Sequence, residues 1–566
     1  MDVDITVTVG GAAGQGIQTV GELLAAAVKQ AGLYCYGIND FESRIRGGHS
    51  FFQLRVSSRQ VCAPRQRVQL LVALNRATIE QHREQLAADA RVILNSEEST
   101  DNDAFITVPF DKLAAQAGDR ITANSVAAGA VLGILGIAPE LLDRVLSDRF
   151  SEKTEALKSN RDAAALGYAA VEKTDFSYRL KSRNCEPTAG ALMNGAQVLA
   201  LGALAGDCRF AAFYPMSPAT GIMIYLASLQ NRFPLMVEQA EDEIAAVNMI
   251  IGASHAGVRS VTATSGGGFC LMTEALGLAG ISETPIVIIN AQRPGPATGL
   301  PTRTAQGDLL FTIHAAQDDF PRFVFAPGSF EEGYECISRA LTLSEQYQVP
   351  AIILVDQLFN DSLGIVEERF AVADRIERYL ETDPEAESGY DYRRYENSIS
   401  GISSRRLPCR GQSLVRVSGD EHSPDGHMSE SAEGRVEMVD KRARKSDSMI
   451  DEVRTPCTRN PSAPLVLVGW GSTKGVLQEA CTLLNAEGID SGHVHFIDIW
   501  PFPALKAEAL LGRGQQIICV EQNSTGQFAR LLRQETGIPV DGHVLKYDGR
   551  PFFTDEIIMQ VKQLIG

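Results

Sequence analysis

The sequence lacks the features of several common protein classes. None of its hydrophobic runs reaches the roughly twenty residues of a transmembrane helix, and its start, MDVDITVTVGG, has no basic segment typical of a signal peptide. Basic residues are the minority, since 52 Lys and Arg face 70 Asp and Glu and give a formal net charge of −18. This charge disfavours binding to nucleic acid or to an anionic membrane surface. We therefore expect a cytoplasmic protein with neither nucleic acid nor membrane as a partner.

Closely spaced cysteines are also missing. The ten cysteines are scattered and form no CxxC pair, whereas iron–sulfur clusters are usually held by cysteines that lie close together in the sequence. Structural disulfides are not expected in a reducing cytosol. We predict that the chain itself binds no cluster.

Length and alternation indicate several α/β domains. The chain has 566 residues, enough for about three or four domains of ~150 residues. Short apolar strands alternate with helical segments, a pattern that predicts doubly wound sheets. We expect three such domains, at 1–183, 184–385 and 463–566. The stretch 386–462 is charged and weakly hydrophobic, which predicts a linker, an arm or partial disorder.

Four histidines have two interpretations. His422 and His427 flank acids in the charged stretch, and His493 and His495 alternate in a predicted strand, HVH. Metal ligation is one interpretation of each pair. We prefer a solvated arm for the first pair and packing near an interface for the second.

The most informative segment runs from Tyr214 to Gly268. It reads FYPMSPAT and then VEQAEDEIAAVNMIIGASHAGVRSVTATSGGG. Three predicted strands end here in polar or glycine-rich loops, the second of them at the carboxylates Glu238, Glu241 and Glu243. Ligands of parallel α/β sheets bind outside the carboxyl ends of the strands. The segment therefore predicts an enzyme with an extended cofactor.

These motifs resemble those of the 2-oxoacid:ferredoxin oxidoreductases. YPMSPAT is similar to the family's YPxTPxS, with Ser217 in place of the usual Thr, and QAEDEIAA with TATSGGG is similar to its pyrimidine-side thiamine diphosphate motif. The resemblance is to the α subunit of the 2-oxoglutarate type with a fused N-terminal γ domain, and it covers nearly the whole chain except about 385–460. It implies a γ-type domain, a pyrimidine-type domain and a transketolase C-terminal-like domain, in that order.

The resemblance also implies a reaction and partners. The reaction is CoA-dependent, reversible oxidative decarboxylation of 2-oxoglutarate to succinyl-CoA and CO₂ with reduction of ferredoxin. Pyruvate, branched-chain oxoacids and indolepyruvate remain alternative substrates, and a scaffold subunit or a transketolase-like transferase remain alternative functions. The sequence has no GDG…NN motif for Mg²⁺ and diphosphate. We therefore expect a β subunit to supply Mg²⁺, the diphosphate site and a [4Fe-4S] cluster, within an (αβ)₂ heterotetramer.

The cofactor's aminopyrimidine needs one carboxyl group near its N1′ atom. Such a group should be buried beside the ring, where desolvation raises a carboxyl pKa. Matching the family's motifs selects Glu241 for this catalytic role, although acids also simply favour a helix N-terminus. Further thiamine contacts are predicted at Tyr214, Pro215, Ser265 and Gly266.

Two arginines in one loop are candidates for binding the oxoacid. The loop AQRPGPATGLPTRTAQGD follows a predicted strand and contains Arg293 and Arg303. A guanidinium group suits bidentate recognition of a carboxylate, and Ser217 keeps a hydroxyl for a hydrogen bond. We predict that Ser217 and one of the two arginines hold the substrate, without choosing between them.

A glycine-rich turn near the N-terminus is a candidate phosphate site. GGAAGQGI follows a strand and opens a helix, so it offers backbone N–H groups to an anion. The resemblance to γ domains favours coenzyme A, while a ligand-free turn and a domain interface are the alternatives. The candidate contacts are Gly14, Gln15, Gly16 and Arg46, the last in the motif FESRIRGGHS.

Overall fold

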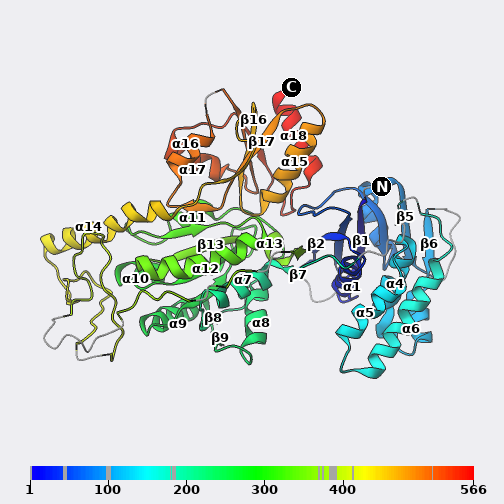
Figure 1. Cartoon of the computed structure of the whole chain (residues 1–566), viewed down its shortest axis with the longest axis horizontal. Helices are drawn as coiled ribbons and strands as arrows, with labels where there is room; N and C mark the ends of the chain where they lie inside the picture. The colour runs from blue at the N-terminus through cyan, green and yellow to red at the C-terminus, as the bar shows by residue number, and fades with distance from the viewer. Residues whose placement is uncertain are drawn as a thin grey trace. The chain divides into compact units, whose positions relative to one another are not determined.

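A computed structural model describes the chain apart from residues 1–2, 43–47, 97–103, 177, 179, 181–185, 368–369, 373–374, 382–391, 411–412 and 513. The chain forms two compact units (Figure 1). Unit 1 comprises Met1–Asn194, Asp361–Arg369 and Phe552–Glu556, and unit 2 comprises Gly195–Asn360, Phe370–Pro551 and Ile557–Gly566. Both combine sheets with helices, so the predicted α/β class is confirmed. None of the helices in the described part of the chain has the length and apolarity to cross a bilayer.

Unit 1 is built on an eight-stranded sheet. Its strands, in spatial order, are β6 (Phe105–Val108), β5 (Leu86–Asn95), β4 (Val68–Ala73), β1 (Asp4–Ala12), β3 (His49–Ser57), β2 (Tyr34–Asp40), β14 (Leu363–Val366) and β7 (Ala191–Asn194). Strand β1 is parallel to β4 and antiparallel to β3. The sheet is therefore parallel on one side of β1 and antiparallel on the other.

The helices of unit 1 pack on this sheet and on one another. They are α1 (Ile17–Gln30), α2 (Arg76–His82), α3 (Phe110–Gln116), α4 (Ala123–Leu135), α5 (Pro139–Arg149) and α6 (Thr154–Val171). Helices α4 and α6 approach so closely that a Cβ on Gly129 or Gly167 would collide with the backbone of the facing helix. The apolar residues of α1 and α4 join those of β1 and β3 in one core.

The first sheet of unit 2 has seven strands, almost all parallel. In spatial order they are β18 (Asp498–Trp500), β12 (Phe323–Phe325), β13 (Ala351–Asp356), β11 (Val287–Gln292), β10 (Ser260–Thr264), β8 (Phe210–Phe213) and β9 (Met236–Gln239). Strands β8, β12 and β13 are largely apolar runs, as expected of strands that are buried on both faces. Alternate residues therefore face opposite helical layers.

Two layers of helices cover the two faces of this sheet. One layer holds α7 (Gly195–Ala205), α8 (Thr220–Leu229) and α12 (Phe330–Tyr347). The other holds α9 (Glu243–His255), α10 (Gly266–Ile281) and α11 (Leu309–Ile313). The polypeptide crosses from one layer to the other at the ends of the strands, and the loops that matter for the site lie there.

The third sheet also belongs to unit 2. Its strands, in spatial order, are β15 (Cys457–Arg459), β17 (Ser491–Phe496), β16 (Leu465–Trp470), β19 (Gln516–Glu521) and β20 (Gly542–Leu545), and its helices are α15 (Lys474–Ala486), α16 (Ala504–Leu510), α17 (Gln527–Thr536) and α18 (Thr554–Ile565). Strand β18, from the same part of the chain, pairs with β12 of the second sheet. The second and third sheets thus share hydrogen bonds as well as a core.

The charged stretch forms an arm (described residues 392–410 and 413–462) that includes helix α14 (Ala432–Met449). It packs on unit 2 mainly through charged groups. Lys441 and Lys445 bind the Glu283 carboxylate at 2.7 and 2.6 Å, and all three side chains are at most 1% exposed. His422 is buried and stacks on Tyr395 with ring centroids 3.9 Å apart. Among the described residues there is no group of His, Cys, Asp and Glu suited to a metal ion.

The residue ranges of the two units differ from those of the expected domains. Strands β7 and β14, which the prediction included in the second domain, complete the sheet of unit 1. Both have only four residues, β7 at the edge of the sheet and β14 next to it, and they are too short to show a sequence pattern of their own. The boundaries 1–183, 184–385, 386–462 and 463–566 stay a prediction.

Candidate active site

The loops singled out from the sequence meet at one edge of the second sheet. Strands β8, β10 and β11 are parallel neighbours, so their carboxyl ends lie at the same edge. Each is followed by one of the expected loops: 214–219 after β8, Ser265 and Gly266 after β10, and 293–308 after β11. The three loops therefore form the carboxyl edge of the sheet, where a ligand is expected.

Glu243 is the buried carboxylate at this edge. Helix α9 begins at Glu243 because the side chain of Asp242 occupies the N-cap position and accepts a hydrogen bond from the Ala245 N–H at 2.7 Å. The Glu243 side chain turns inward, is 3% exposed, and its Oε1 has no hydrogen-bond partner. A Cβ on Gly268 would lie 2.5 Å from that oxygen, so only glycine allows α10 to approach it.

The other two carboxylates of the cluster point elsewhere. Glu238 and Glu241 are exposed, and Glu241 precedes the helix cap. The family's motif indicates Glu241, whereas the carboxylate that is buried within this chain is Glu243. The geometry adds Glu243 as a second candidate for the carboxyl group next to a bound ring, and the assignment of Glu241 from the motif stays a prediction.

The N-terminus of α10 is lined by polar atoms. Ser265 is fully buried, makes no capping hydrogen bond and leaves its Oγ without a partner. A Cβ on Gly266 would collide with the carboxylate of Asp308. Asn290, at the end of β11, donates to that carboxylate at 3.2 Å. Burial raises the pKa of Asp308, while the Asn290 hydrogen bond and the Arg293 charge oppose this shift.

Arg293 and Ser217 lie together, as the substrate prediction requires. Arg293 Nη1 donates to the carbonyl of Ser217 at 2.8 Å and contacts the Met216 sulfur at 3.3 Å, while its buried Nε has no partner. Burial lowers the pKa of Arg293, and the charges of Asp308 and Glu243 counteract this. The Ser217 side chain is exposed, Pro215 is half-buried, and Tyr214 is 38% exposed. These side chains line the open side of the cluster.

Arg303 lies deeper in the same loop. It is 8% exposed, and its backbone N–H donates to the Leu300 carbonyl at 3.2 Å. Its neighbour Thr304 donates from its N–H to the Gly549 carbonyl at 3.3 Å, and a Cβ on Gly549 would lie 3.1 Å from the Arg303 Cβ. This arginine is therefore held by the third sheet's part of unit 2, whereas Arg293 is held by the loop after β8.

The glycine turn of unit 1 is a tight strand–helix connection. Gly14 and Gly16 have φ angles of 89° and 71°, a conformation that favours glycine. The Gln15 side chain folds back and accepts the Ala12 N–H at 2.7 Å, so this donor already has a partner within the loop. Arg46, the fourth candidate for coenzyme A, lies outside the described residues.

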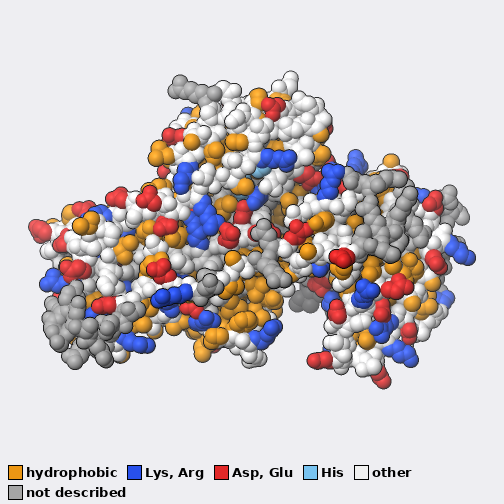
Figure 2. Space-filling view, in the orientation of Figure 1, with side chains coloured by type: hydrophobic (Ala, Val, Ile, Leu, Met, Phe, Trp, Pro, Cys, Tyr) orange, Lys and Arg blue, Asp and Glu red, His pale blue; other side chains and the backbone are white. Residues whose placement is uncertain are grey.

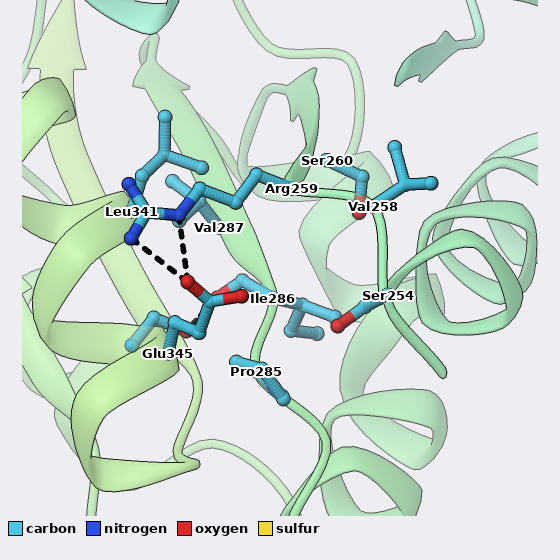
Figure 3. Close-up of a pocket in the computed structure, with 10 residues that line it drawn as sticks. Ser254, Val258, Arg259, Ser260, Pro285, Ile286, Val287, Leu341 and Glu345 are labelled. Carbon is cyan, nitrogen blue, oxygen red and sulfur yellow. Dashed lines mark hydrogen bonds and ion pairs between the residues drawn. The ribbon is translucent and has the colours of Figure 1, made fainter. Parts of the chain in front are cut away.

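A small pocket at the opposite, amino edge of the second sheet has a different character (Figure 3). It lies between the starts of β10 and β11 and helix α12. Arg259 and Glu345, which face each other there, are both 3% exposed and form an ion pair at 2.8 Å. Because its charges satisfy one another, we do not take this pocket as the active site.

Sequence reasoning did not identify Asp308 and Asn290. Asn290 belongs to β11 and reads as part of the apolar run PIVIIN, and Asp308 closes the irregular loop. Asn290 could have been identified by its position, because it is a polar residue near the carboxyl end of a buried strand, where ligands bind. The sequence alone could not show that Asp308 returns to α10.

Comparison with known proteins agrees with this geometry. Family models described as "Pyruvate ferredoxin/flavodoxin oxidoreductase", "Pyruvate flavodoxin/ferredoxin oxidoreductase, thiamine diP-bdg" and "Pyruvate:ferredoxin oxidoreductase core domain II" match residues 6–170, 201–441 and 463–547. The whole candidate cluster lies within the thiamine-binding match.

Related proteins match over nearly their whole length. The α subunit of a Sulfolobus 2-oxoacid:ferredoxin oxidoreductase is 32% identical over 97% of this chain and 95% of its own. The 2-oxoglutarate oxidoreductase subunit KorA of Mycobacterium tuberculosis is 28% identical over 98% and 90%. The solved structure of 2-oxoglutarate:ferredoxin oxidoreductase from Magnetococcus marinus, with 2-oxoglutarate, coenzyme A and succinyl-CoA bound, has a TM-score of 0.91 at 30% identity over 100% of both chains.

Proposed function

The chain belongs to the 2-oxoacid:ferredoxin oxidoreductases as an α subunit, and from this premise we propose that it forms half of a thiamine-dependent 2-oxoglutarate:ferredoxin oxidoreductase. The reaction is the oxidative decarboxylation of 2-oxoglutarate. The C1–C2 bond breaks, C1 leaves as CO₂, and a thioester bond forms between C2 and the coenzyme A sulfur. The two electrons released pass one at a time to ferredoxin, and the thiol proton goes to solvent. The same steps reversed would carboxylate succinyl-CoA.

The unpartnered carboxylate oxygen of Glu243 is the observation that supports this proposal most strongly. Buried polar atoms in proteins are nearly always hydrogen-bonded, and an orphan costs free energy. The Glu243 Oε1 is such an atom, and it lies beside the glycine-rich start of α10. A ring nitrogen of a bound aminopyrimidine would give this oxygen its partner. The residues thus fit the pyrimidine half of thiamine diphosphate.

We assign further contacts from the polar atoms around Glu243. Ser265 Oγ is also buried without a partner, and Gly266 leaves room at the helix start. Tyr214 and Pro215 follow β8 on the open side of the cluster. When bound, thiamine diphosphate supplies the nucleophile for the oxo carbon, and Glu243 holds or releases a proton at the ring nitrogen during that step. The remaining role of the chain is to orient the oxoacid and exclude water.

The two arginines suit a substrate with two carboxylates. Arg293 and Arg303 belong to the loop after β11, and neither is fully exposed. Planar guanidinium groups bind carboxylates in a bidentate manner, so one arginine for each carboxylate of 2-oxoglutarate is the simplest assignment. The relatives named for 2-oxoglutarate support the same choice over pyruvate. Ser217 contributes a hydroxyl at the mouth of the site.

A β subunit is the proposed partner. The matched relatives are named as α subunits, and this chain has no GDG…NN motif. We assign Mg²⁺, the diphosphate site and a [4Fe-4S] cluster to the β subunit, and an (αβ)₂ assembly to the complex. Coenzyme A is assigned to the glycine turn of unit 1, with Gly14, Gln15, Gly16 and Arg46 as contacts.

An exposed apolar surface on unit 2 fits such a partner. Strand β9 is an edge strand of the second sheet, and Figure 2 shows hydrophobic side chains gathered over α8 and this edge. Ile224 on α8, Met236 on β9 and Ile244 on α9 are 61%, 60% and 50% exposed. An apolar edge strand left open to water is a liability, so proteins usually cover it. We assign this surface to the β subunit.

Assays of the chain with and without its β partner test the proposal. The chain alone should be colourless and inactive, and the complex should reduce ferredoxin with CoA and 2-oxoglutarate faster than with pyruvate, branched-chain oxoacids or indolepyruvate. A complex that prefers another oxoacid would disprove the 2-oxoglutarate assignment alone. Brown colour and activity in the isolated chain would disprove the shared site.

A further inference from the structure

The last part of the loop that carries Arg303 is bound by the third sheet. Its centre is Gln306, which is fully buried. The Gln306 Nε2 donates to the Trp470 carbonyl at 2.8 Å, at the end of β16. Its Oε1 accepts the N–H of Gln522 at 3.0 Å, just after β19. Both polar atoms of this side chain are therefore used to join two strand ends of another sheet.

The backbone of the same loop is held by the same strand ends. The Gln306 N–H donates to the Gln522 carbonyl at 2.7 Å, and the Gln306 carbonyl accepts Asn523 Nδ2 at 3.2 Å. Gln527 binds the residues that follow Gln306. Its Nε2 donates to the Gly307 carbonyl at 2.7 Å, and its Oε1 accepts the Leu310 N–H at 3.1 Å. The loop thus has six hydrogen bonds to the third sheet between positions 306 and 310, counting two each from the Gln306 side chain, the Gln306 backbone and Gln527.

We call these hydrogen bonds of Thr304, Gln306, Gly307 and Leu310 to the third sheet the clamp. Gln306, at its centre, lies between two residues that face the candidate site. Arg303 is three positions before Gln306, and Asp308, whose carboxylate lies against Gly266 and Asn290, is two positions after it. A shift of Gln306 would displace both. Irregular loops rich in proline and glycine have no helix or ladder to define their path, so these hydrogen bonds determine where the side chains stand.

We propose that Gln306 is a positioning residue of the oxoacid site, through which the third sheet sets the place of Arg303 and Asp308. This inference rests on the proposed function and deepens it. It gives the third sheet a part in substrate recognition besides packing. Both polar atoms of the Gln306 side chain bond to the third sheet, so its effect should reach the oxoacid through the position of the loop.

Substitution of the two glutamines tests the proposal in the complex with the β subunit. Gln306→Met keeps the length of the side chain and removes both of its polar contacts, and Gln527→Met does the same at a half-buried position. Each should raise the KM for 2-oxoglutarate about tenfold, below the ~100-fold that a misplacement of 1 Å can cost. The kcat should fall less than the KM rises, and the KM for coenzyme A should stay within about twofold of the wild-type value, because coenzyme A is assigned to the glycine turn of unit 1.

Gln348→Met is the matched control. Gln348 is 2% exposed and uses both side-chain atoms, donating to the Ser403 carbonyl at 2.6 Å and accepting from Arg394 at 2.7 Å, but it binds the arm and not the loop. It should leave the oxoacid KM unchanged. An equal rise in this control, or no rise in Gln306→Met and Gln527→Met, would overturn the positioning role.

Hydrogen exchange separates this inference from the proposed function. The amides of Thr304, Gln306 and Leu310 donate within the clamp, so their protection should fall in Gln527→Met and stay at the wild-type level in Gln348→Met. This readout needs no turnover. A wild-type complex without activity on any 2-oxoacid would disprove the proposed function, whereas unchanged protection in Gln527→Met would disprove the clamp.

Discussion

The carboxyl and amino edges of the second sheet bury polar groups in opposite ways. At the carboxyl edge, Glu243, Ser265, Asn290 and Arg293 each have a buried polar atom without a partner. At the amino edge, Glu283 is bound by two lysines, and Glu345 lies within 2.8 Å of Arg259 and 2.7 Å of Arg378. Both edges are charged and buried, but only the first has capacity left for a ligand.

Whether a buried polar group has a partner distinguishes a binding site from a structural contact better than burial alone does. A buried ion pair whose members satisfy one another holds two parts of the chain together, and removing one partner leaves an uncompensated charge. An unpartnered buried carboxylate lowers stability unless something binds it. The amino edge therefore anchors the arm, and the carboxyl edge has buried polar atoms that could bind the proposed cofactor.

The largest expected effect is that of Glu243→Gln on activity. Glutamine keeps the size of the side chain but cannot exchange a proton with a ring nitrogen, so kcat should fall by the ~10²- to 10⁴-fold typical of general acid–base catalysis. Ferredoxin reduction by the complex with the β subunit measures this. Thermal unfolding should not be impaired, because no hydrogen bond of Oε1 is lost.

Glu241→Gln and Glu238→Gln are the matched controls. Both side chains are exposed in this chain, and their loss should change kcat much less. A loss of activity in Glu241→Gln that exceeds that of Glu243→Gln would restore the assignment made from the motif.

Glu283→Gln should lower stability and leave kcat nearly unchanged, the reverse of Glu243→Gln. It leaves Lys441 and Lys445 buried without their counter-charge, which should destabilise the folded state by about 3–5 kcal/mol. The catalytic constants of the folded complex should stay near those of wild type. Denaturant unfolding and steady-state kinetics on the same preparation test both statements, and a loss of kcat without a loss of stability would contradict the division between the two edges.

The loss of folding stability caused by Glu283→Gln should depend on pH. Burial alone would raise the pKa of Glu283, but Lys445, Lys441 and Arg394 outweigh it and hold that pKa below its usual value of 4.5. A carboxyl group with a lowered folded-state pKa contributes its full stability above the unfolded value and loses it as the pH falls further. The destabilisation caused by Glu283→Gln should therefore shrink below about pH 4.5.

Much of this site could be predicted from the sequence, and the parts that could not have a physical reason. The strand ends were predictable because the short predicted strands stop at Pro, Gly and acids. The burial of Glu243 among the three carboxylates was not, because it follows from Asp242 taking the N-cap of α9. A search for cap residues would have found it, since Asp is a preferred N-cap. The packing of the arm depends on Glu283 and Lys445, which are far apart in the sequence.

The arginine substitutions should weaken oxoacid binding. Removing a desolvated charge that pairs with a carboxylate costs about 2–5 kcal/mol, so Arg293→Met or Arg303→Met should raise the KM for 2-oxoglutarate with a smaller change in kcat. Comparing 2-oxoglutarate with pyruvate identifies the arginine that reads the second carboxylate, because only that variant should lose its preference. If neither variant alters oxoacid kinetics, the loop after β11 does not bind the substrate.

The smallest effect expected at the carboxyl edge is that of Ser217→Ala. Its side chain is exposed, and the contact with Arg293 uses the Ser217 carbonyl, so the substitution keeps that hydrogen bond and removes only a hydroxyl. One neutral hydrogen bond contributes about 0.5–1.5 kcal/mol, which corresponds to a roughly two- to tenfold loss in kcat/KM. Ser217→Thr restores the hydroxyl that the family's motif usually has at this place and should recover the wild-type value. An effect of Ser217→Ala as large as that of Arg293→Met would show that the residue positions the loop through its fold, and failure of Ser217→Thr to recover activity would show that the hydroxyl does not bind substrate.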